Sequence, residues 1–185
     1  MNNYEILLIN PGKNPHNETI EGNIKRKGYM YPYSLLYLQN FLIKHHISSK
    51  IIDLYWQPVN HIFDFLNTSS NPIIGVTAQA HSVNEAISII KEIKKEKPSS
   101  FIVVGGNHFG YSAIDTLENI QEIDVVVRGE GEETFYELVN AKINSFDFDS
   151  INGISFRKNS EIIENIDRRV SKDLEHYSLD YENLP

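Results

Sequence analysis

Short apolar runs rich in isoleucine and valine recur along the chain, and each is followed by a polar or glycine-containing turn and then a stretch with helical periodicity. This alternation predicts a parallel sheet, and nearly continuous apolar runs are typical of strands covered on both faces. The expected strands are residues 4–10, 50–54, 72–76, 101–104 and 124–127. The expected helices are residues 33–45, 59–66, 83–96, 114–119 and 132–141.

Five strand–helix units with short, right-handed connections favour a flavodoxin-like (Rossmann-like) α/β fold, a three-layer sandwich with a five-stranded parallel sheet in the order 2-1-3-4-5. In such a sheet, ligands bind beyond the carboxyl ends of the strands. After residue 150 the pattern changes to a hairpin over residues 151–166, and residues 171–185 form an acidic stretch without a long apolar run. We therefore expect a sheet domain over residues 1–150, and a hairpin and linker over residues 151–185.

Composition narrows the class of protein. With 185 residues, of which 41% are hydrophobic and 11% aromatic, the chain can bury a core of its own, which excludes disorder and disulfide-stapled miniproteins. The net charge of −8 argues against binding nucleic acid. The absence of cysteine excludes disulfides, zinc fingers and cysteine-held iron–sulfur clusters from this polypeptide. Because no apolar run approaches the roughly 20 residues of a membrane span and no signal peptide is visible, we expect a cytoplasmic chain without membrane contact.

The strand-end rule singles out four loops as one rim, over residues 11–16, 77–81, 105–109 and 128–132. Gly105 and Gly106 follow the fourth strand, where they permit positive φ angles and let a ligand lie against bare backbone, although a plain tight turn would use them equally well. Thr77 ends the third strand with a small hydroxyl that could bond a ligand or cap the next helix.

Three carboxylates, those of Glu130, Glu132 and Glu133, begin the last helix, where the helix dipole favours negative charge. We interpret Glu133 as part of a charged helix start. Glu130 and Glu132 stand beside glycines at a strand-to-helix turn, which makes them candidates to touch a ligand or a partner domain. General acid–base catalysis needs one carboxyl in an apolar pocket with a raised pKa and the other in contact with solvent. The sequence shows no such difference between the two residues, so the pair does not predict a hydrolase.

The loops match no common nucleotide or phosphoacceptor motif. Residues 10–14 follow the first strand and provide neither the Gly-x-Gly-x-x-Gly of a dinucleotide fold nor the Gly-Lys-Ser/Thr of a P-loop. A receiver domain would carry an aspartate after the third strand, where this chain has Thr77. His16, His81 and His108 fall on three separate rim loops, and a three-histidine site would need all three to converge without a helical pair, so we predict no metal-ligating residues.

The remaining combination resembles the cobalamin-binding domain at the amino end of many radical S-adenosylmethionine enzymes. The matching segments begin at Ile74 (Ile-Gly-Val-Thr-Ala), Val103 (Val-Val-Gly-Gly-Asn-His), Ile123 (Ile-Asp-Val-Val-Val-Arg-Gly-Glu-Gly-Glu-Glu-Thr) and Asn152 (Asn-Gly-Ile-Ser-Phe-Arg), with a trailing Asp-Leu at Asp173. Together they follow the order of elements across nearly the whole chain. The Gly-Gly-x-His and Arg-Gly-Glu-Gly-Glu pair at this spacing is specific.

This resemblance implies that the chain binds cobalamin, with the corrin ring on the rim and the nucleotide tail beside the sheet, where small residues leave room. It implies no catalytic residue, and it implies cofactor contacts from Thr77, Ala78, Gly105, Gly106, Asn107, His108, Glu130 and Gly131. Other cobalamin proteins carry Asp-x-His-x-x-Gly, whose histidine ligates cobalt. The corresponding stretch, residues 30–35, lacks that pattern, so we expect no histidine below the metal.

The resemblance also implies a larger parent enzyme. Its catalytic domain binds S-adenosylmethionine and holds an iron–sulfur cluster with three cysteines, which this chain lacks. We therefore expect a radical S-adenosylmethionine catalytic domain in cis, beyond the linker, for methyl transfer or a related reaction such as a cyclisation. The alternatives are a stand-alone module and a cofactor-free docking or substrate-shaping domain of the same fold.

Overall fold

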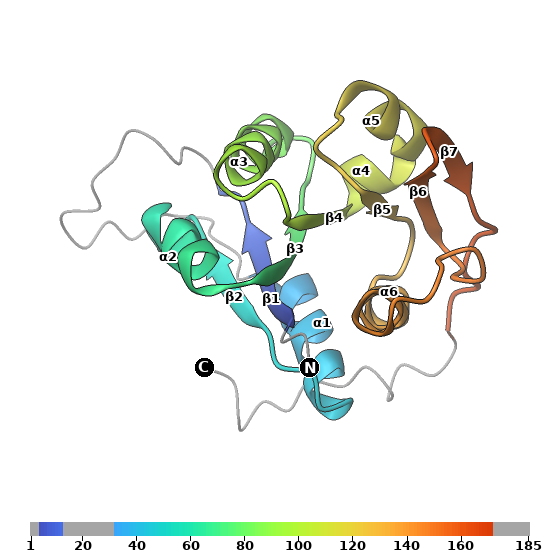
Figure 1. The fold of residues 1–185 in the computed structure, drawn as a ribbon, viewed down its shortest axis with the longest axis horizontal. Coiled ribbons are helices and arrows are strands. Elements are labelled where there is room, and N and C mark those ends of the chain that lie inside the picture. Colours follow the sequence, from blue (N-terminus) through green and yellow to red (C-terminus); the bar gives the residue numbers. More distant parts are fainter. Residues whose placement is uncertain (1–3, 13–31, 172–185) are drawn as a thin grey trace.

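The computed structural model describes residues 4–12 and 32–171 of the chain (Figure 1). His16, the stretch 30–31 and the linker from residue 172 onward lie outside the described residues. Within the described ranges, one sheet has the strand order β2-β1-β3-β4-β5-β6-β7. Its strands are β1 (Tyr4–Asn10), β2 (Lys50–Asp53), β3 (Asn71–Thr77), β4 (Phe101–Gly105), β5 (Val125–Val127), β6 (Ile154–Lys158) and β7 (Glu161–Glu164).

The first five strands are parallel, and their arrangement confirms the predicted order 2-1-3-4-5. The predicted hairpin also forms, and it continues the same sheet: β6 pairs antiparallel with β5, and β7 pairs antiparallel with β6. Asn159 and Ser160 both have positive φ in its two-residue turn, which is the geometry that matches the twist of hairpin strands. The sheet is therefore mixed and runs across residue 150.

Helices cover both faces of the sheet (Figure 1). One face carries α1 (Tyr33–Lys44) and α6 (Glu132–Asn144), and the other carries α2 (Asn60–Thr68), α3 (Val83–Glu96), α4 (Asn107–Tyr111) and α5 (Ala113–Asn119). In the part of the chain that the structure describes, no helix has the length and apolar character needed to cross a membrane.

The predicted loop over residues 105–109 is wrong from residue 107 onward, because α4 begins there. Gly106, with φ of 86°, turns the chain out of β4 and directly into this helix. Five residues with an internal glycine are too short to show helical periodicity, so the sequence pattern carries no signal for α4. As a result, Phe109 lies in the core rather than on the rim.

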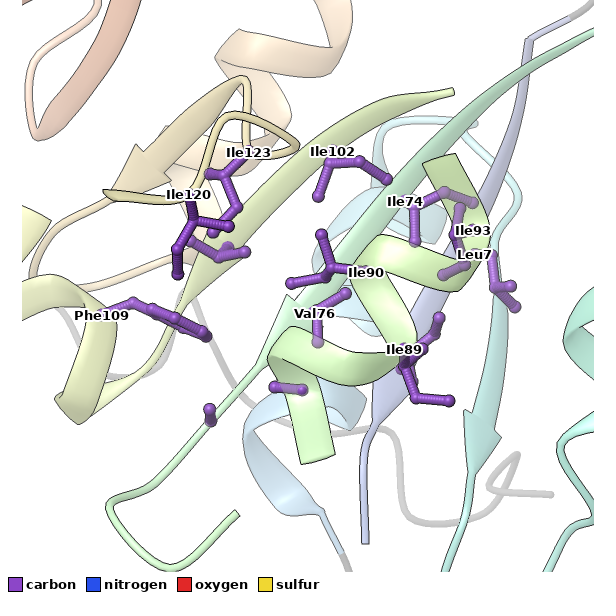
Figure 2. Packing of buried hydrophobic residues seen from close by; sticks show 14 of the residues in the cluster. Leu7, Ile74, Val76, Ile89, Ile90, Ile93, Ile102, Phe109, Ile120 and Ile123 are labelled. Carbon is purple, nitrogen blue, oxygen red and sulfur yellow. The ribbon is translucent and has the colours of Figure 1, made fainter. Parts of the chain in front are cut away.

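Alternate residues along each strand enter two separate cores, as expected for a sheet covered on both faces. Ile74 and Val76 of β3 belong to the cluster under α3, where they meet Ile90 and Ile102 (Figure 2). Ile73 belongs to the opposite cluster, under α1 and α6. This alternation assigns each residue at the carboxyl end of a strand to one face or the other.

Candidate cofactor-binding site

The sheet face under α1 and α6 loses side-chain bulk toward the carboxyl ends of the strands. Along β3 the residues of this face are Ile73, Gly75 and Thr77, and along β4 the last two are Val103 and Gly105. Thr77 and Gly105 stand opposite each other in the ladder. The space beside Gly105 is open, whereas the side chains of Leu8 and Phe135 pack over Gly75, where a Cβ would lie 2.9 Å from Leu8 Cδ2 and 3.2 Å from the Phe135 ring.

A cavity of about 490 Å³ occupies this space, between the strand ends and helices α1 and α6. The volume lies within the range of small-molecule and cofactor sites. The buried side chains of this face that line it are apolar: Leu8, Leu35, Val103, Val127 and Phe135. Val76 and Val104 also border the cavity, although their side chains belong to the opposite core. The exposed or half-buried polar residues that line it are Ser34, Thr77, Gln79, Asn107, Tyr111, Glu130 and Glu132. The cavity thus has an apolar inner end and a polar mouth at the rim.

The structure brings most of the predicted site residues together at this cavity. Those that line it are Thr77, Gly105, Gly106, Asn107, Glu130 and Gly131. Ala78 and His108 are placed elsewhere: Ala78 is buried in the opposite core, and the ring of His108 packs edge-on against Phe109. Their backbones are linked, since the His108 amide donates to the Ala78 carbonyl over 3.4 Å.

The backbone requires glycine at Gly106 but not at Gly105. A Cβ on Gly106 would lie 2.7 Å from Thr77 Oγ1 and 2.9 Å from the Ala78 carbonyl oxygen, and the φ of 86° adds strain for any side chain. The fold itself therefore requires Gly106. Gly105 has no such φ, and its Cβ would meet Val127 at an ordinary 3.7 Å. A side chain at Gly105 would fit the backbone and would occupy the cavity.

Thr77 does not cap a helix, so that interpretation is wrong. Helix α3 begins at Val83, and Ser82 precedes it. Among the described residues, no group is hydrogen-bonded to the Thr77 hydroxyl, which lies half-buried at the cavity mouth. A small hydroxyl in this position can bond a polar group of a ligand.

Two arginines fix the loops around the mouth, and sequence reasoning missed both roles. The Arg128 guanidinium pairs with Glu164 at 2.7 Å and with Asp167 at 2.9 Å. Arg168 pairs with Glu133 at 3.0 Å and also contacts Glu137. Since each partner lies more than 30 residues away, no local pattern could reveal these pairs. They hold the segment after β7 against the loop before α6 and the first turns of that helix.

Glu133 is thus a structural residue at the start of α6, as interpreted from the sequence, whereas Glu132 faces the cavity. Burial raises the pKa of Glu132 above its ordinary value of 4.5, and the nearby charges of Glu130 and Glu133 add to this shift. The backbone amides of Glu132 and Gly131 oppose it. Glu132 is therefore a carboxylate that the fold holds in a partly dry position at the rim.

We predict that Glu132→Gln stabilises the protein at neutral pH. With the folded-state pKa raised, the folded protein binds more protons than the unfolded chain between pH 4.5 and the folded pKa, so the wild type loses stability as pH rises through this window. The variant keeps its stability through this pH range because glutamine does not ionise. Its advantage in the free energy of unfolding, measured by urea denaturation, should be absent well below pH 4.5 and should grow as the pH rises from 4.5 toward the folded-state pKa.

A matched substitution at the exposed Glu118 of α5 should change the unfolding free energy little. If Glu132→Gln were no more stable than the wild type at pH 8, burial would not be the dominant influence on this carboxylate.

The three histidines considered as a metal site are not brought together by the described residues. His81 is exposed in the loop after β3, His108 lies in α4, and His16 is outside the described residues. Within residues 4–12 and 32–171, no cluster of three or more histidine, aspartate or glutamate side chains is arranged to hold a metal ion. No described residue that lines the cavity is a histidine.

Comparison with known proteins identifies the family. A family model described as the B12 binding domain matches residues 22–139. The chain is 29% identical over 184 residues to an uncharacterized methyltransferase of Pyrococcus horikoshii, covering 98% of this chain and 39% of that protein. It is 36% identical over 90 residues to the anaerobic magnesium-protoporphyrin IX monomethyl ester cyclase of Synechocystis sp., covering 49% of this chain and 18% of the cyclase.

Among solved structures, the fold matches TsrM, a radical S-adenosylmethionine methyltransferase from Kitasatospora setae with cobalamin and a 4Fe–4S cluster bound. The TM-score is 0.72 at 22% identity, over 90% of this chain and 31% of that chain. This chain thus spans less than half the length of each of these relatives. The family match covers strands β2 to β5 and the rim loops over residues 77–81, 105–109 and 128–132, and it agrees with the resemblance read from the motifs. The chain belongs to the B12 binding domain family, and it resembles the domains of that family in cobalamin-dependent radical S-adenosylmethionine enzymes.

Proposed function

We propose that this chain binds cobalamin, with the nucleotide tail in the cavity and the corrin ring across the rim. The observation that carries the proposal is the cavity itself, which is open beside Gly105 on the sheet face under α1 and α6. Since neither backbone strain nor a clash requires glycine at Gly105, the missing side chain is explained by the space that it leaves. A cofactor-free docking domain, the alternative, has no need of this space.

The residues at the mouth would bind the polar part of the tail. The hydroxyls of Ser34 and Thr77 and the amide of Asn107 can bond phosphate and ribose oxygens, and the bare backbone at Gly105 and Gly106 permits close approach. Glu130 stands near the corrin edge in this arrangement. When bound, cobalamin supplies a cobalt centre that can carry a methyl group.

We further propose that no histidine of this chain ligates the cobalt from below. The described residues around the cavity support this, since they include no histidine. The stretch at residues 32–35, where the family motif would end, contributes Ser34 and Leu35 to the cavity instead. A cobalt held in this way keeps its lower face free of a protein ligand.

The activity of the whole protein is also a proposal. The Pyrococcus horikoshii methyltransferase and the TsrM methyltransferase both extend well beyond the part that this chain matches. We infer a radical S-adenosylmethionine domain in cis, which would hold the iron–sulfur cluster and S-adenosylmethionine, for methyl transfer or a related reaction. This chain would present the cofactor to that domain and would have no catalytic residue of its own.

Reconstitution tests cofactor binding directly. The 185-residue chain is incubated with hydroxocobalamin and desalted, and its visible spectrum is recorded. We expect about one equivalent of corrinoid to remain with the protein, because the tail would be held inside the cavity in the proposed arrangement. A colourless protein after desalting would contradict the proposal and would favour the docking-domain alternative.

The same sample tests the lower ligand. After reduction to cobalt(II), the electron paramagnetic resonance spectrum should lack nitrogen splitting along the axial direction, since neither a histidine nor the tail base lies under the metal. Labelling the protein with ¹⁵N identifies the source of any splitting. A splitting that changes with the label would show a protein nitrogen on cobalt, and one that does not change would show that the tail base remains on the metal.

A further inference from the structure

The buried side chains at the inner end of the cavity carry no polar atom. Leu8, Val103, Val127 and Phe135 are all at least nine-tenths buried, and none carries a polar side-chain atom. The backbone groups of β3 and β4 pair with each other along the ladder, so they are already satisfied. Among the described residues, the polar side chains that line the cavity are exposed or half-buried, at the rim end.

This distribution matters for the base that ends a corrinoid tail. Corrinoids differ in that base: cobalamin carries 5,6-dimethylbenzimidazole, and its adenine counterpart carries a purine of similar size. Adenine has two ring nitrogens where the benzimidazole has carbon, and an exocyclic amino group where the benzimidazole has a hydrogen. Each of these groups would leave water without gaining a side-chain partner at the inner end of the cavity, and a buried polar group without a partner lowers affinity.

We propose that this cavity selects corrinoids by their tail base, accepting dimethylbenzimidazole and rejecting adenine. This inference rests on the proposed function, because it assumes that the tail enters the cavity. An apolar pocket discriminates moderately against a ligand of the same shape that adds a polar group, by up to about 100-fold. Each unpaired group is expected to weaken binding by about tenfold or more.

Equilibrium dialysis of the full chain against three probes separates the possible outcomes. The probes are hydroxocobalamin, adeninylcobamide and cobinamide, which has no nucleotide tail. We expect adeninylcobamide to bind at least about tenfold more weakly than cobalamin. If cobalamin binds more tightly than cobinamide but less than about tenfold more tightly than adeninylcobamide, this inference is wrong and the proposed function still holds. Failure to bind any corrinoid, or equal binding of cobinamide and cobalamin, would overturn the placement of the tail and this inference with it.

A pair of neighbouring substitutions on β5 tests the cause. Val127→Thr adds a hydroxyl inside the cavity with little change of shape, whereas Val126→Thr adds the same hydroxyl to the opposite core. We expect Val127→Thr to reduce the ratio of the affinity for cobalamin to the affinity for adeninylcobamide at least threefold. Val126→Thr should leave this affinity ratio unchanged. Far-ultraviolet circular dichroism confirms that both variants fold. An unchanged ratio in folded Val127→Thr would show that the apolar lining does not set the preference.

Discussion

Gly105→Leu should abolish cobalamin retention while leaving the fold intact. The glycine ends β4 on the face that lines the cavity, directly across the ladder from Thr77. Its backbone accepts a side chain, since a Cβ there would make only an ordinary contact of 3.7 Å with Val127. The three further carbons of leucine then have to enter the cavity, where they would take the volume that the tail needs. The measurement is the visible spectrum after reconstitution and desalting, with circular dichroism to confirm folding.

Ala80→Leu provides the matched control. It adds similar apolar bulk to the exposed loop after β3, at a residue that does not line the cavity, so retention should match that of the wild type. Gly106→Leu is a poor substitute for Gly105→Leu, because its Cβ would lie 2.7 Å from Thr77 Oγ1 and would disturb the turn itself. If folded Gly105→Leu retained cobalamin as well as Ala80→Leu does, the tail would not lie in this cavity.

The positions of the strands could be predicted from the sequence because hydrophobic periodicity is a local property. Their order then followed from the rules for short, right-handed connections. The helix at Val83–Glu96 has the predicted ends, since its apolar residues recur with helical spacing and a proline follows closely. The grouping of Thr77, Gly105 and Gly131 at one rim followed from the rule for strand ends. These predictions needed no knowledge of which residues meet across the fold.

Other features depend on contacts that no local pattern shows. Arg128 is part of a recognised motif, yet its role depends on Glu164 at the end of β7 and on Asp167 in the segment that follows the sheet. The family resemblance implies a cofactor contact from Ala78, a residue without bulk that leaves room for the tail. Alternation along an extended chain sends neighbours to opposite faces, and Ala78 lies in the opposite core. The alternation was visible in the sequence, so this placement could have been predicted.

Phe109→Ala should cost the protein about 3–5 kcal/mol of unfolding free energy, the range observed when a large aromatic side chain is removed from a core. Phe109 is 1% exposed and belongs to the cluster under α3 with Val76, Ile90 and Ile120 (Figure 2). The helix that carries it, α4, has only five residues, so it has little stability of its own. Phe109 is the buried side chain of this helix and contributes most of its packing against the core, so the loss should be close to the upper end of the range.

Tyr111→Ala, in the same short helix, separates packing from helix propensity. Tyr111 is 92% exposed, so its removal should change the unfolding free energy by less than about 0.5 kcal/mol in the same urea titration. Equal effects of the two substitutions would mean that α4 is held by its backbone and not by the buried ring. Because Gly106 and Asn107 connect α4 to the cavity, a loosened α4 in Phe109→Ala should also weaken cobalamin retention, whereas Tyr111→Ala should leave α4 in place.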